Sequence, residues 1–219
     1  MAYYPLFLDL TERWCVVVGG GRVAARKAEA LLEAGARVRV IAPRAHPGLQ
    51  ALADSGRLVL LRRPYRAGDL RGCVLAIAAT DDSAVNRAVY AASIRRGIPC
   101  NTVDQPALCT FIAPAVMRRG DLVIAISTGG ASPALVRRLR RDLEARIGPE
   151  YAAFVDLLRQ ARVRLRAALP DSSARKRALY RLVASPALDL LRAGRPGEAR
   201  ALVDSLLARA IRPARRNRG

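Results

Sequence analysis

The first hundred residues alternate short apolar runs, rich in β-branched side chains, with longer stretches in which apolar positions repeat at helical spacing. The apolar runs predict strands over residues 15–18, 37–42, 58–61, 74–79 and 100–103. The periodic stretches between them predict helices over residues 23–34, 49–55 and 84–96. This alternation is typical of βαβ units, whose right-handed crossovers favour a doubly wound parallel sheet of order 3-2-1-4-5.

The pattern changes near residue 110, where two apolar runs, 111–117 and 122–127, flank Arg118-Arg119-Gly120-Asp121. A short polar break of this kind suits a hairpin better than a crossover. Ser132-Pro133 then predicts the start of a helix, with Ser132 as the N-cap, that ends before Gly148-Pro149. Beyond this break, leucines recur at helical intervals and three prolines separate the segments, so the rest of the chain is predicted to be helical.

These patterns predict an α/β protein in three parts. A Rossmann-like doubly wound parallel sheet occupies residues 1–112, and a small α/β segment occupies residues 113–149. A helical C-terminal domain occupies residues 150–219, and its last residues, from Arg212 on, are predicted to form a frayed basic tail.

The composition is that of a globular protein, because 52% of the residues are hydrophobic and 26% are charged. No run of about 18 uncharged apolar residues occurs. The N-terminus lacks a basic region and a cleavage-like pattern, so we expect a cytoplasmic protein without a membrane span. The four cysteines form no CxxC pair and His46 is the single histidine, so no metal site is predicted. We expect reduced, structural thiols and a surface position for His46.

The formal net charge of +20 at pH 7 is carried almost wholly by arginine, because only Lys27 and Lys176 among the 38 basic residues are lysines. Such an excess suits a nucleic acid, an anionic membrane or a polyanionic small molecule, and charge alone does not choose among them. The helical third has no clear helix-turn-helix spacing, and acidic residues interrupt its arginines. We therefore expect neither nucleic acid nor membrane as a partner.

The turn after the first predicted strand has the sequence Val18-Gly19-Gly20-Gly21-Arg22-Val23-Ala24 and opens a helix. It matches G-x-G-x-x-A, in which the first glycine permits the bend, the second lets the backbone approach a pyrophosphate and the alanine permits close packing. The free N–H groups and the dipole of the helix then stabilise the phosphate charge. This context predicts a dinucleotide site formed by Gly19, Gly20, Gly21, Arg22, Val23 and Ala24.

Two further loops are predicted to border the same cofactor. The acidic residue that usually binds the ribose, about 20 residues further on, is missing, and Ala42-Pro43-Arg44 stands there instead. Pro43 and Arg44 are therefore candidate cofactor contacts. Arg44 would accommodate the 2′-phosphate of NADP, so the residues alone leave NAD and NADP open. Thr80 and Asp81 follow the fourth strand and are predicted to border the cofactor, whereas Asp82 caps the next helix.

Residues 6–133 carry a series of motifs besides the glycine turn. They include Leu32-Glu33-Ala34-Gly35-Ala36, Ala76-Ile77-Ala78-Ala79-Thr80-Asp81-Asp82, Asn101-Thr102-Val103-Asp104, Phe111-Ile112-Ala113-Pro114 and Ser127-Thr128-Gly129-Gly130-Ala131-Ser132-Pro133. In this combination, order and spacing the chain resembles the precorrin-2 dehydrogenase/sirohydrochlorin ferrochelatase family, the N-terminal module of bacterial sirohaem synthases. The helical remainder resembles the family only in kind.

The resemblance implies an oxidoreductase of sirohaem biosynthesis that oxidises precorrin-2 to sirohydrochlorin with NAD. Some members also insert ferrous iron, as a substrate, into sirohydrochlorin, and others act as the dehydrogenase only; both alternatives stay open here. The resemblance further implies a homodimer in which a dimerisation segment, here residues 113–149, exchanges contacts with its partner. The substrate would be an anionic tetrapyrrole with eight carboxylates, which suits an arginine-rich protein.

Asp104 is the residue predicted to act in catalysis. It ends the fifth predicted strand, at the carboxyl edge where ligands of doubly wound folds bind, and it matches the family's aspartate in Asn-x-x-Asp. A carboxylate there would take the proton that dehydrogenation releases. The residues predicted to bind the substrate are Asn101 and a second glycine turn, Ser127, Thr128, Gly129 and Gly130.

One alternative belongs to a different class of protein. In it the chain is a NAD-binding redox regulator that uses its basic helical domain on nucleic acid, and its binding would weaken steeply with salt. The absence of a clear helix-turn-helix spacing in residues 150–219 disfavours this alternative.

Overall fold

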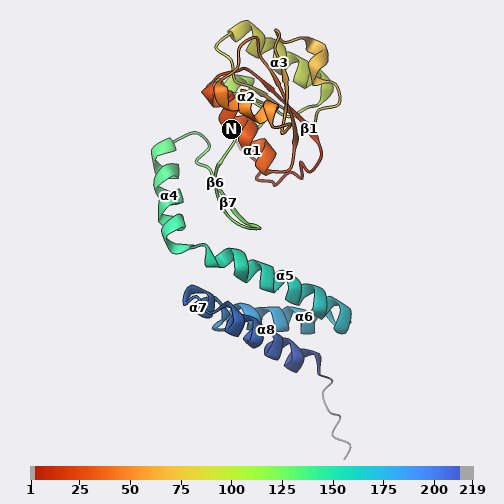
Figure 1. Cartoon of the computed structure of the whole chain (residues 1–219), viewed down its shortest axis with the longest axis vertical. Helices are drawn as coiled ribbons and strands as arrows, with labels where there is room; N and C mark the ends of the chain where they lie inside the picture. Colours follow the sequence, from red (N-terminus) through yellow and green to blue (C-terminus); the bar gives the residue numbers. More distant parts are fainter. Residues whose placement is uncertain (1–2, 213–219) are drawn as a thin grey trace, which may run out of the picture. The chain divides into compact units, whose positions relative to one another are not determined.

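The computed structural model describes residues 3–212, which fall into two compact units with the boundary between Ala113 and Pro114. Each unit is described here by itself. The first unit is an alternation of strands and helices (Figure 1): β1 Trp14–Val18, α1 Arg22–Glu33, β2 Arg37–Ile41, α2 Pro47–Asp54, β3 Val59–Leu61, β4 Leu75–Ala78, α3 Ser83–Arg96 and β5 Cys100–Thr102.

The strands of this unit form one parallel sheet in the order β3-β2-β1-β4-β5, which confirms the predicted topology. β1 lies at the centre, where Val16 is in register with Arg39 of β2 on one side and with Ala76 of β4 on the other. Val16 and Val17 are fully buried, because helices cover both faces of the sheet. All five strands end at one edge, where the loops that follow them form the ligand crevice of this class of fold.

Two apolar clusters hold the helices against the sheet. On one face Ala24 and Ala28 of α1 pack in the same cluster as Val17. On the other face Val89 of α3 packs in the same cluster as Val16. The small side chains of the two alanines let α1 approach the strand closely, so the start of the helix is fixed next to the end of β1.

The predicted elements of this unit are confirmed, with ends that differ by one or two residues. α2 begins at Pro47, because Nδ1 of His46 accepts a hydrogen bond from the backbone N–H of Gly48 at 3.1 Å and caps the helix. Gly35 follows α1 with a φ of +78°, a left-handed conformation in which glycine commonly ends a helix. The pattern does not predict two short 3-10 helices, η1 Ala67–Leu70 and η2 Pro106–Leu108, because a single turn shows no periodicity.

The second unit begins with β6 Ala115–Arg119, β7 Leu122–Ile126 and α4 Pro133–Arg146. The two strands pair antiparallel, and Arg119 is in register with Leu122, so Gly120 and Asp121 form the turn of the predicted hairpin. The Oγ atom of Ser132 accepts a hydrogen bond from Leu135 N at 3.2 Å. This bond confirms Ser132 as the N-cap of α4.

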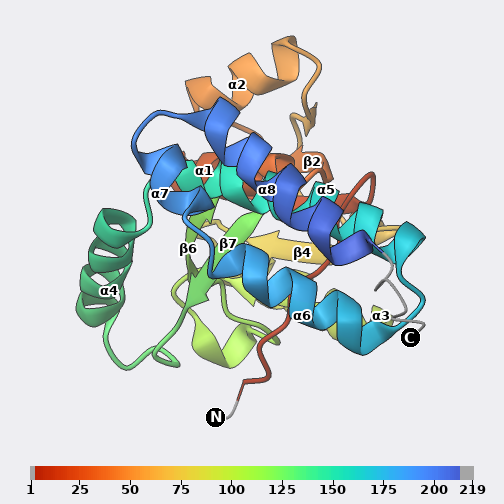
Figure 2. The ribbon, with the colours of Figure 1, turned by 90° about the horizontal axis from the view of Figure 1, so that it is seen from below.

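Four helices complete the second unit: α5 Glu150–Ala168, α6 Ser172–Val183, α7 Ala187–Arg192 and α8 Pro196–Ile211. Figure 2 shows α6 and α8 lying beside α5, and their apolar faces share one core that includes Phe154, Leu165 and Leu182. The three prolines fall between the helices or at their first turns, as predicted. The sequence pattern predicts a domain boundary after residue 149. In the structure, the described residues from Pro114 on form one compact unit.

Two predictions concern the ends and the surroundings of the chain. The predicted basic tail, apart from Arg212, lies outside the described residues. Within residues 3–212 no helix has the length and the apolar character needed to cross a membrane.

Asp69 anchors the long connection from β3 to β4. Its carboxylate accepts hydrogen bonds from Nη1 and Nη2 of Arg63, at 2.9 and 2.6 Å, and from the backbone N–H of Arg66 at 2.8 Å. The hydrogen bond from Arg63 holds the pKa of this carboxyl below its usual range, although burial acts in the opposite direction. The guanidinium of Arg39, 4.8 Å from the ring centroid of Trp14, donates to the carbonyl oxygen of Asp69. The connection is thereby fixed to the sheet.

We expect Asp69→Asn to lower the free energy of unfolding of the first unit by about 1–2 kcal/mol at pH 7, because Arg63 loses a charged partner. The pKa of Asp69 is lower in the folded state than the ordinary value of about 3.9 in the unfolded chain. The contribution of the carboxylate is therefore present above about pH 4 and is lost as the pH falls through the folded-state pKa. Urea unfolding followed by the fluorescence of Trp14, the single tryptophan, measures it.

The matched control is Glu12→Gln, which removes the exposed partner of Arg37 in the same unit and should change its free energy of unfolding by less than about 0.5 kcal/mol. A difference between wild type and Asp69→Asn that stayed constant from pH 7 down to pH 2 would contradict the role of the ionised carboxylate.

Candidate active site

Four loops come together at the carboxyl edge of the parallel sheet. Backbone hydrogen bonds of 2.7–2.9 Å connect each loop to a neighbouring strand or loop. These bonds run from Gly19 N to Ile41 O, from Ala79 N to Val18 O, from Val103 N to Ala78 O and from His46 N to Gly20 O. The residues predicted to contact the cofactor, and Asp104, therefore lie on loops or in the first turn of α1, at one edge of one unit.

The glycine turn owes two of its three glycines to this close packing of loops. A Cβ atom on Gly19, whose φ is +129°, would stand 2.1 Å from the carbonyl oxygen of Ala79. A Cβ atom on Gly20 would stand 1.8 Å from the carbonyl oxygen of Arg44. A Cβ atom on Gly21 would meet nothing within 4 Å, so this glycine faces open space. This is the position at which the backbone is predicted to approach a pyrophosphate.

The first turn of α1 is suited to bind an anion. Gly21 is the N-cap of α1, and within the described chain no side chain caps this end and no acidic residue lies in its first turn. The first N–H groups and the positive end of the helix dipole are therefore directed toward the open space beside Gly21. Arg22 and Val23 are exposed at this end, and Ala24 is fully buried against the sheet.

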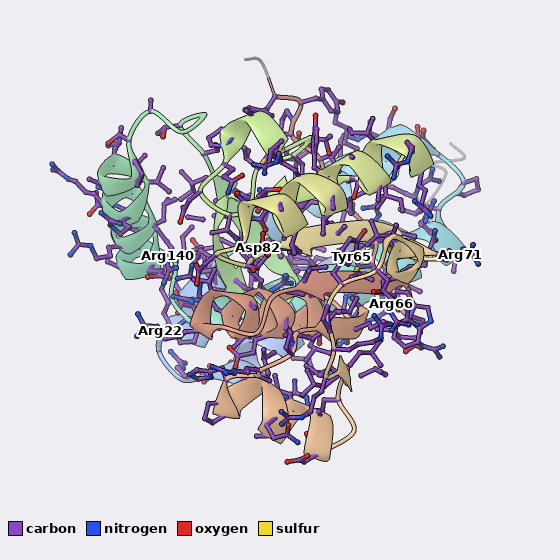
Figure 3. All side chains as sticks on the ribbon, turned by 90° about the horizontal axis from the view of Figure 1, so that it is seen from above. Arg22, Tyr65, Arg66, Arg71, Asp82 and Arg140 are labelled. Carbon is purple, nitrogen blue, oxygen red and sulfur yellow. The ribbon has the colours of Figure 1, made fainter. Side chains whose placement is uncertain are left out.

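The second and third predicted contacts lie on the adjoining loops. Pro43 and Arg44 follow β2 and are exposed, whereas Thr80 follows β4 and is half-buried beside the exposed Asp81. Asp82 caps α3 as predicted, because its Oδ1 accepts hydrogen bonds from the backbone N–H groups of Ala84 and Val85 at 2.8 and 3.1 Å. Figure 3 shows Arg22 and Asp82, where α1 and α3 begin, toward one side of the sheet, and Arg66 and Arg71 of the β3–β4 connection toward the other.

Asp104 follows β5 at the same edge, and its side chain is exposed. Its backbone has a φ of +58°, a left-handed conformation that among the described non-glycine residues only Glu12 shares. Such a conformation costs free energy in any residue with a Cβ atom and persists only where the surrounding structure imposes it. The loop therefore fixes the backbone from which the carboxylate predicted to act in catalysis extends.

Asn101 and Lys27 lie close to this loop. Asn101 is buried, and Nδ2 of its amide donates to Phe111 O at 3.1 Å, so this nitrogen holds the loop together. Lys27 of α1 is half-buried; burial and the charge of Arg26 lower the pKa of its ammonium group, and Asp104 acts in the opposite direction. The sequence analysis does not include Lys27 in the site. The one feature of the sequence that could have drawn attention to Lys27 is that almost all other basic residues of the chain are arginines.

The second predicted glycine turn lies in the other unit, after β7. Gly129 and Gly130 both adopt left-handed conformations, with φ values of +63° and +92°. Ser127 Oγ accepts from Gly129 N, and Thr128 Oγ1 accepts from Ser132 N, each at 3.0 Å. Both hydroxyl oxygens thus stabilise the turn itself, and their predicted contact with substrate stays a prediction.

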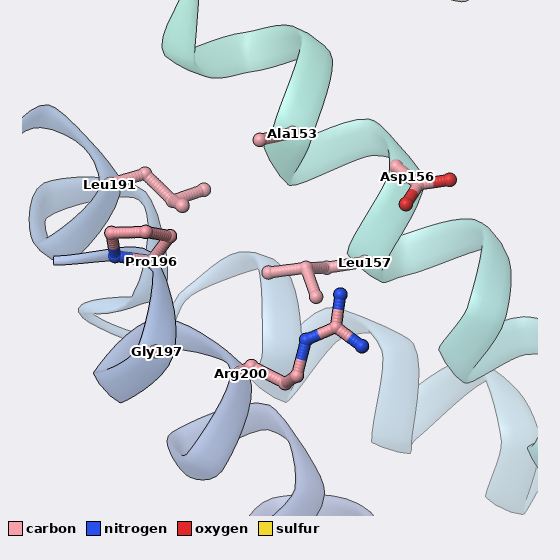
Figure 4. A pocket seen from close by; sticks show the side chains of 7 residues that line it. All are labelled: Ala153, Asp156, Leu157, Leu191, Pro196, Gly197 and Arg200. Carbon is pink, nitrogen blue, oxygen red and sulfur yellow. The ribbon is translucent and has the colours of Figure 1, made fainter. Parts of the chain in front are cut away.

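Hollows lie between the helices of the second unit. One of about 200 Å³ between α5, α7 and α8 is lined by Ala153, Asp156, Leu157, Leu191, Pro196, Gly197 and Arg200 (Figure 4). The other, of about 460 Å³ between α5 and α6, has four basic residues, Arg162, Arg166, Arg175 and Lys176, beside an apolar wall. Throughout residues 3–212, no group of three or more His, Cys, Asp or Glu side chains is arranged to hold a metal ion.

The cysteines are free, and three of them are buried. Burial raises the pKa of the Cys15 thiol to about 11, and the nearby Cys73 adds to the shift. Burial also raises the pKa of the Cys73 thiol and of the Cys100 thiol. These three thiols stay protonated at neutral pH and act as small apolar side chains, which agrees with the structural role predicted for them.

Three family models match consecutive parts of the chain. A model of NAD(P)-binding domains matches residues 6–115, and a model of the central part of sirohaem biosynthesis proteins matches residues 119–146. The model of the sirohaem synthase dimerisation region matches residues 150–207. The sequence analysis assigns dimerisation to residues 113–149, ahead of the helices that this model matches.

Curated relatives and a solved structure extend over most of the chain. Siroheme synthases from Pseudomonas aeruginosa (strain LESB58) and Methylococcus capsulatus (strain Bath) are each 45% identical, over 95% and 98% of this chain. The chain spans less than half of these relatives, 45% and 46% of their length. The solved structure of SirC, a precorrin-2 dehydrogenase, is 28% identical with a TM-score of 0.74, covering 93% of this chain and all of that one.

The unequal surroundings of the glycines predict opposite effects of two neighbouring substitutions. Gly21→Ala should leave the unfolding curve unchanged, because φ −79° and ψ −177° suit alanine and the space is open. It should weaken the binding of a nicotinamide dinucleotide about tenfold or more, because the methyl group fills the approach of the pyrophosphate. Isothermal titration calorimetry measures the affinity.

Gly20→Ala is the matched control for folding. Its methyl group would overlap Arg44 O, so we expect the free energy of unfolding to fall by at least about 2 kcal/mol. Wild-type affinity in Gly21→Ala would mean that the dinucleotide does not cross the backbone at this glycine.

Proposed function

Because the chain belongs to the NAD(P)-binding family matched over residues 6–115, here followed by the central and dimerisation regions of sirohaem biosynthesis proteins, we propose that it oxidises precorrin-2 to sirohydrochlorin with NAD. One observation carries the proposal. The open space at Gly21 and the exposed carboxylate of Asp104, whose backbone is left-handed, lie on loops at the same edge of one sheet. The full-length likeness to a precorrin-2 dehydrogenase supports the choice of substrate.

The dinucleotide would lie along the carboxyl edge of the sheet. The N–H groups at the start of α1 would bind its pyrophosphate, and the loops after β2 and β4 would border its two ends. NAD supplies a hydride acceptor when it is bound. The residues proposed to hold it are Gly19, Gly20, Gly21, Arg22, Val23, Ala24, Pro43, Arg44, Thr80 and Asp81.

Asp104 is proposed to take the proton of the reaction. Oxidation of precorrin-2 removes two hydrogens, one leaving as a hydride to the nicotinamide and the other as a proton. A carboxylate fixed at the sheet edge by its own loop accepts that proton without first having to be ordered. Its exposed position lets the proton pass on to solvent.

The anionic macrocycle would be held by hydrogen-bond donors and arginines. Asn101 and the turn Ser127, Thr128, Gly129 and Gly130 are proposed to contact the substrate, the turn through the N–H groups at the start of α4. Arginine binds carboxylates through paired N–H groups, so an arginine-rich surface draws a polycarboxylate toward the site. We also propose that two copies of the chain assemble as a homodimer, because residues 150–207 match a dimerisation region.

A second step at the same site uses ferrous iron as a substrate. Insertion of Fe²⁺ into sirohydrochlorin displaces two pyrrole N–H protons, and Asp104 would accept them. The macrocycle itself supplies four nitrogen ligands, so this step requires no permanent metal site in the protein. The initial rate with sirohydrochlorin and Fe²⁺, compared with the spontaneous rate, decides between the bifunctional enzyme and the dehydrogenase alone.

We expect Asp104→Ala to lower the rate of precorrin-2 oxidation at least about 100-fold, because the reacting proton loses its acceptor. The dissociation constant for NAD should change less than about twofold, since the glycine turn is untouched. Formation of sirohydrochlorin, followed by its absorbance, measures the rate. Near-normal turnover in this variant would remove Asp104 from the mechanism.

The choice between NAD and NADP is tested at Arg44. We expect kcat/KM to be higher with NAD in the wild type, and Arg44→Ala to lower kcat/KM for NADP about tenfold while leaving NAD within about twofold. The reason is that at the 2′ position of the ribose NADP offers this guanidinium a phosphate, whereas NAD offers an uncharged hydroxyl. A wild-type preference for NADP would overturn the assignment of NAD.

A further inference from the structure

The loop that carries Asp104 is closed at its base. The backbone N–H of Thr110 donates to Cys100 O at 2.8 Å, and Cys100 N donates to Oγ1 of Thr110 at 2.8 Å. Residues 101–109 therefore leave β5 and return to the same point of the sheet. Asp104 lies in this loop and has a left-handed backbone.

The thiol of Cys109 occupies the inside of the loop. Its sulfur accepts hydrogen bonds from the backbone N–H of Thr102 at 3.2 Å and from Nδ2 of Asn101 at 3.5 Å. It also lies 3.2 Å from Thr102 O and 3.4 Å from Gln105 O, and its single hydrogen serves one of these oxygens at a time. These partners stand on both sides of Asp104 in the sequence.

This arrangement distinguishes Cys109 from the other cysteines. Cys15, Cys73 and Cys100 belong to the apolar clusters of the sheet, where a cysteine acts as a small apolar side chain. Cys109 instead lies beside the end of β5, the edge strand of the sheet, where no further strand of the described chain pairs with it. There its sulfur is the hydrogen-bond partner of the backbone of Thr102. Thr102 is buried, so its N–H would lose its partner if the sulfur were removed, and a buried donor without a partner is costly.

The neighbouring helix lies close enough to be part of the same arrangement. Val103 and Phe111, at the two ends of the loop, pack against the cluster that contains Ala24 and Ala28 of α1. Lys27 lies between these alanines in the sequence of the helix, and the charge of Asp104 raises the pKa of its ammonium group, against the effect of burial. A loop of fixed shape therefore sets the place of the Asp104 carboxylate relative to the first helix.

We propose that Cys109 is a positioning residue, whose thiol holds the loop in the shape that keeps Asp104 in its left-handed conformation at the sheet edge. This inference rests on the proposed function, because it assigns to Cys109 an effect on the proton acceptor of that reaction. Cys109 itself touches neither substrate nor cofactor in this scheme.

The experiment compares Cys109→Ala and Cys109→Ser with wild type in precorrin-2 oxidation. We expect Cys109→Ala to lower kcat about 10- to 100-fold, because a small displacement of a reacting group has an effect of this size. KM for NAD should stay within about twofold, since the glycine turn is unaffected. Cys109→Ser should keep most of the wild-type rate, because a serine hydroxyl accepts a hydrogen bond from Thr102 N and donates to the same backbone oxygens as the thiol.

A double-mutant cycle separates positioning from general loss of stability. If Cys109 acts through Asp104, the variant Asp104→Ala/Cys109→Ala should be no slower than Asp104→Ala alone. Cys73→Ala removes a buried thiol elsewhere in the same unit and should leave kcat within about twofold. Where Cys109→Ala does not fold, Cys109→Val, which fills the space without accepting a hydrogen bond, takes its place in the cycle.

The outcomes are distinguishable. Wild-type kcat in Cys109→Ala, or equal losses in Cys109→Ala and Cys109→Ser, would overturn the role of the thiol while the dehydrogenase activity of the wild type stands. In the double variant, the fold losses of kcat caused by Asp104→Ala and by Cys109→Ala could also multiply. That result would overturn the role of the thiol, because the two residues would then act independently. Absence of precorrin-2 oxidation in the wild-type protein would instead overturn the proposed function.

Discussion

The candidate site depends on close contact between the backbone of the glycine turn and the backbones of the neighbouring loops. The glycine turn after β1 lies so close to the loops after β2 and β4 that a single added carbon on Gly19 or Gly20 would overlap a carbonyl oxygen. The glycine turn and the end of β1 hold the loops on both sides, through hydrogen bonds from His46 N to Gly20 O and from Ala79 N to Val18 O. The candidate site is therefore built on rigid backbone, and only its outer side, at Gly21, is left open.

The sequence predicts the parallel sheet well for a physical reason. A strand buried on both faces must be apolar throughout, and the crossovers have one hand, so β1 and its neighbours have few alternative orders. Local signals are equally dependable: Asp82 and Ser132 cap the helices that follow them, as their positions predict. The positions of Gly21 and Asp104 at one sheet edge follow from the same rules.

Other parts of the site depend on contacts that no local pattern encodes. Gly20 is required by the carbonyl oxygen of Arg44, which is far from it in the sequence, and the sulfur of Cys109 accepts a hydrogen bond from Thr102 N across the loop. Lys27 resembles any polar residue on a helix until the fold brings it near Asp104. His46 has the pattern of a surface residue and serves as a helix cap. For Gly20, Cys109 and Lys27, contacts between separate segments decide the role of the residue, whereas the His46 cap is a local contact with Gly48.

The left-handed backbone of Asp104 has a consequence for protein engineering. Glycine or asparagine would adopt this conformation at lower cost, so thermal stability and chemistry make opposite demands on one position. A library of variants selected for heat resistance alone would accumulate those two residues at position 104, and under the proposed mechanism these proteins would be robust but would lack the proton acceptor. Improvement of this enzyme by stability screening therefore has to hold that codon constant and vary the rest.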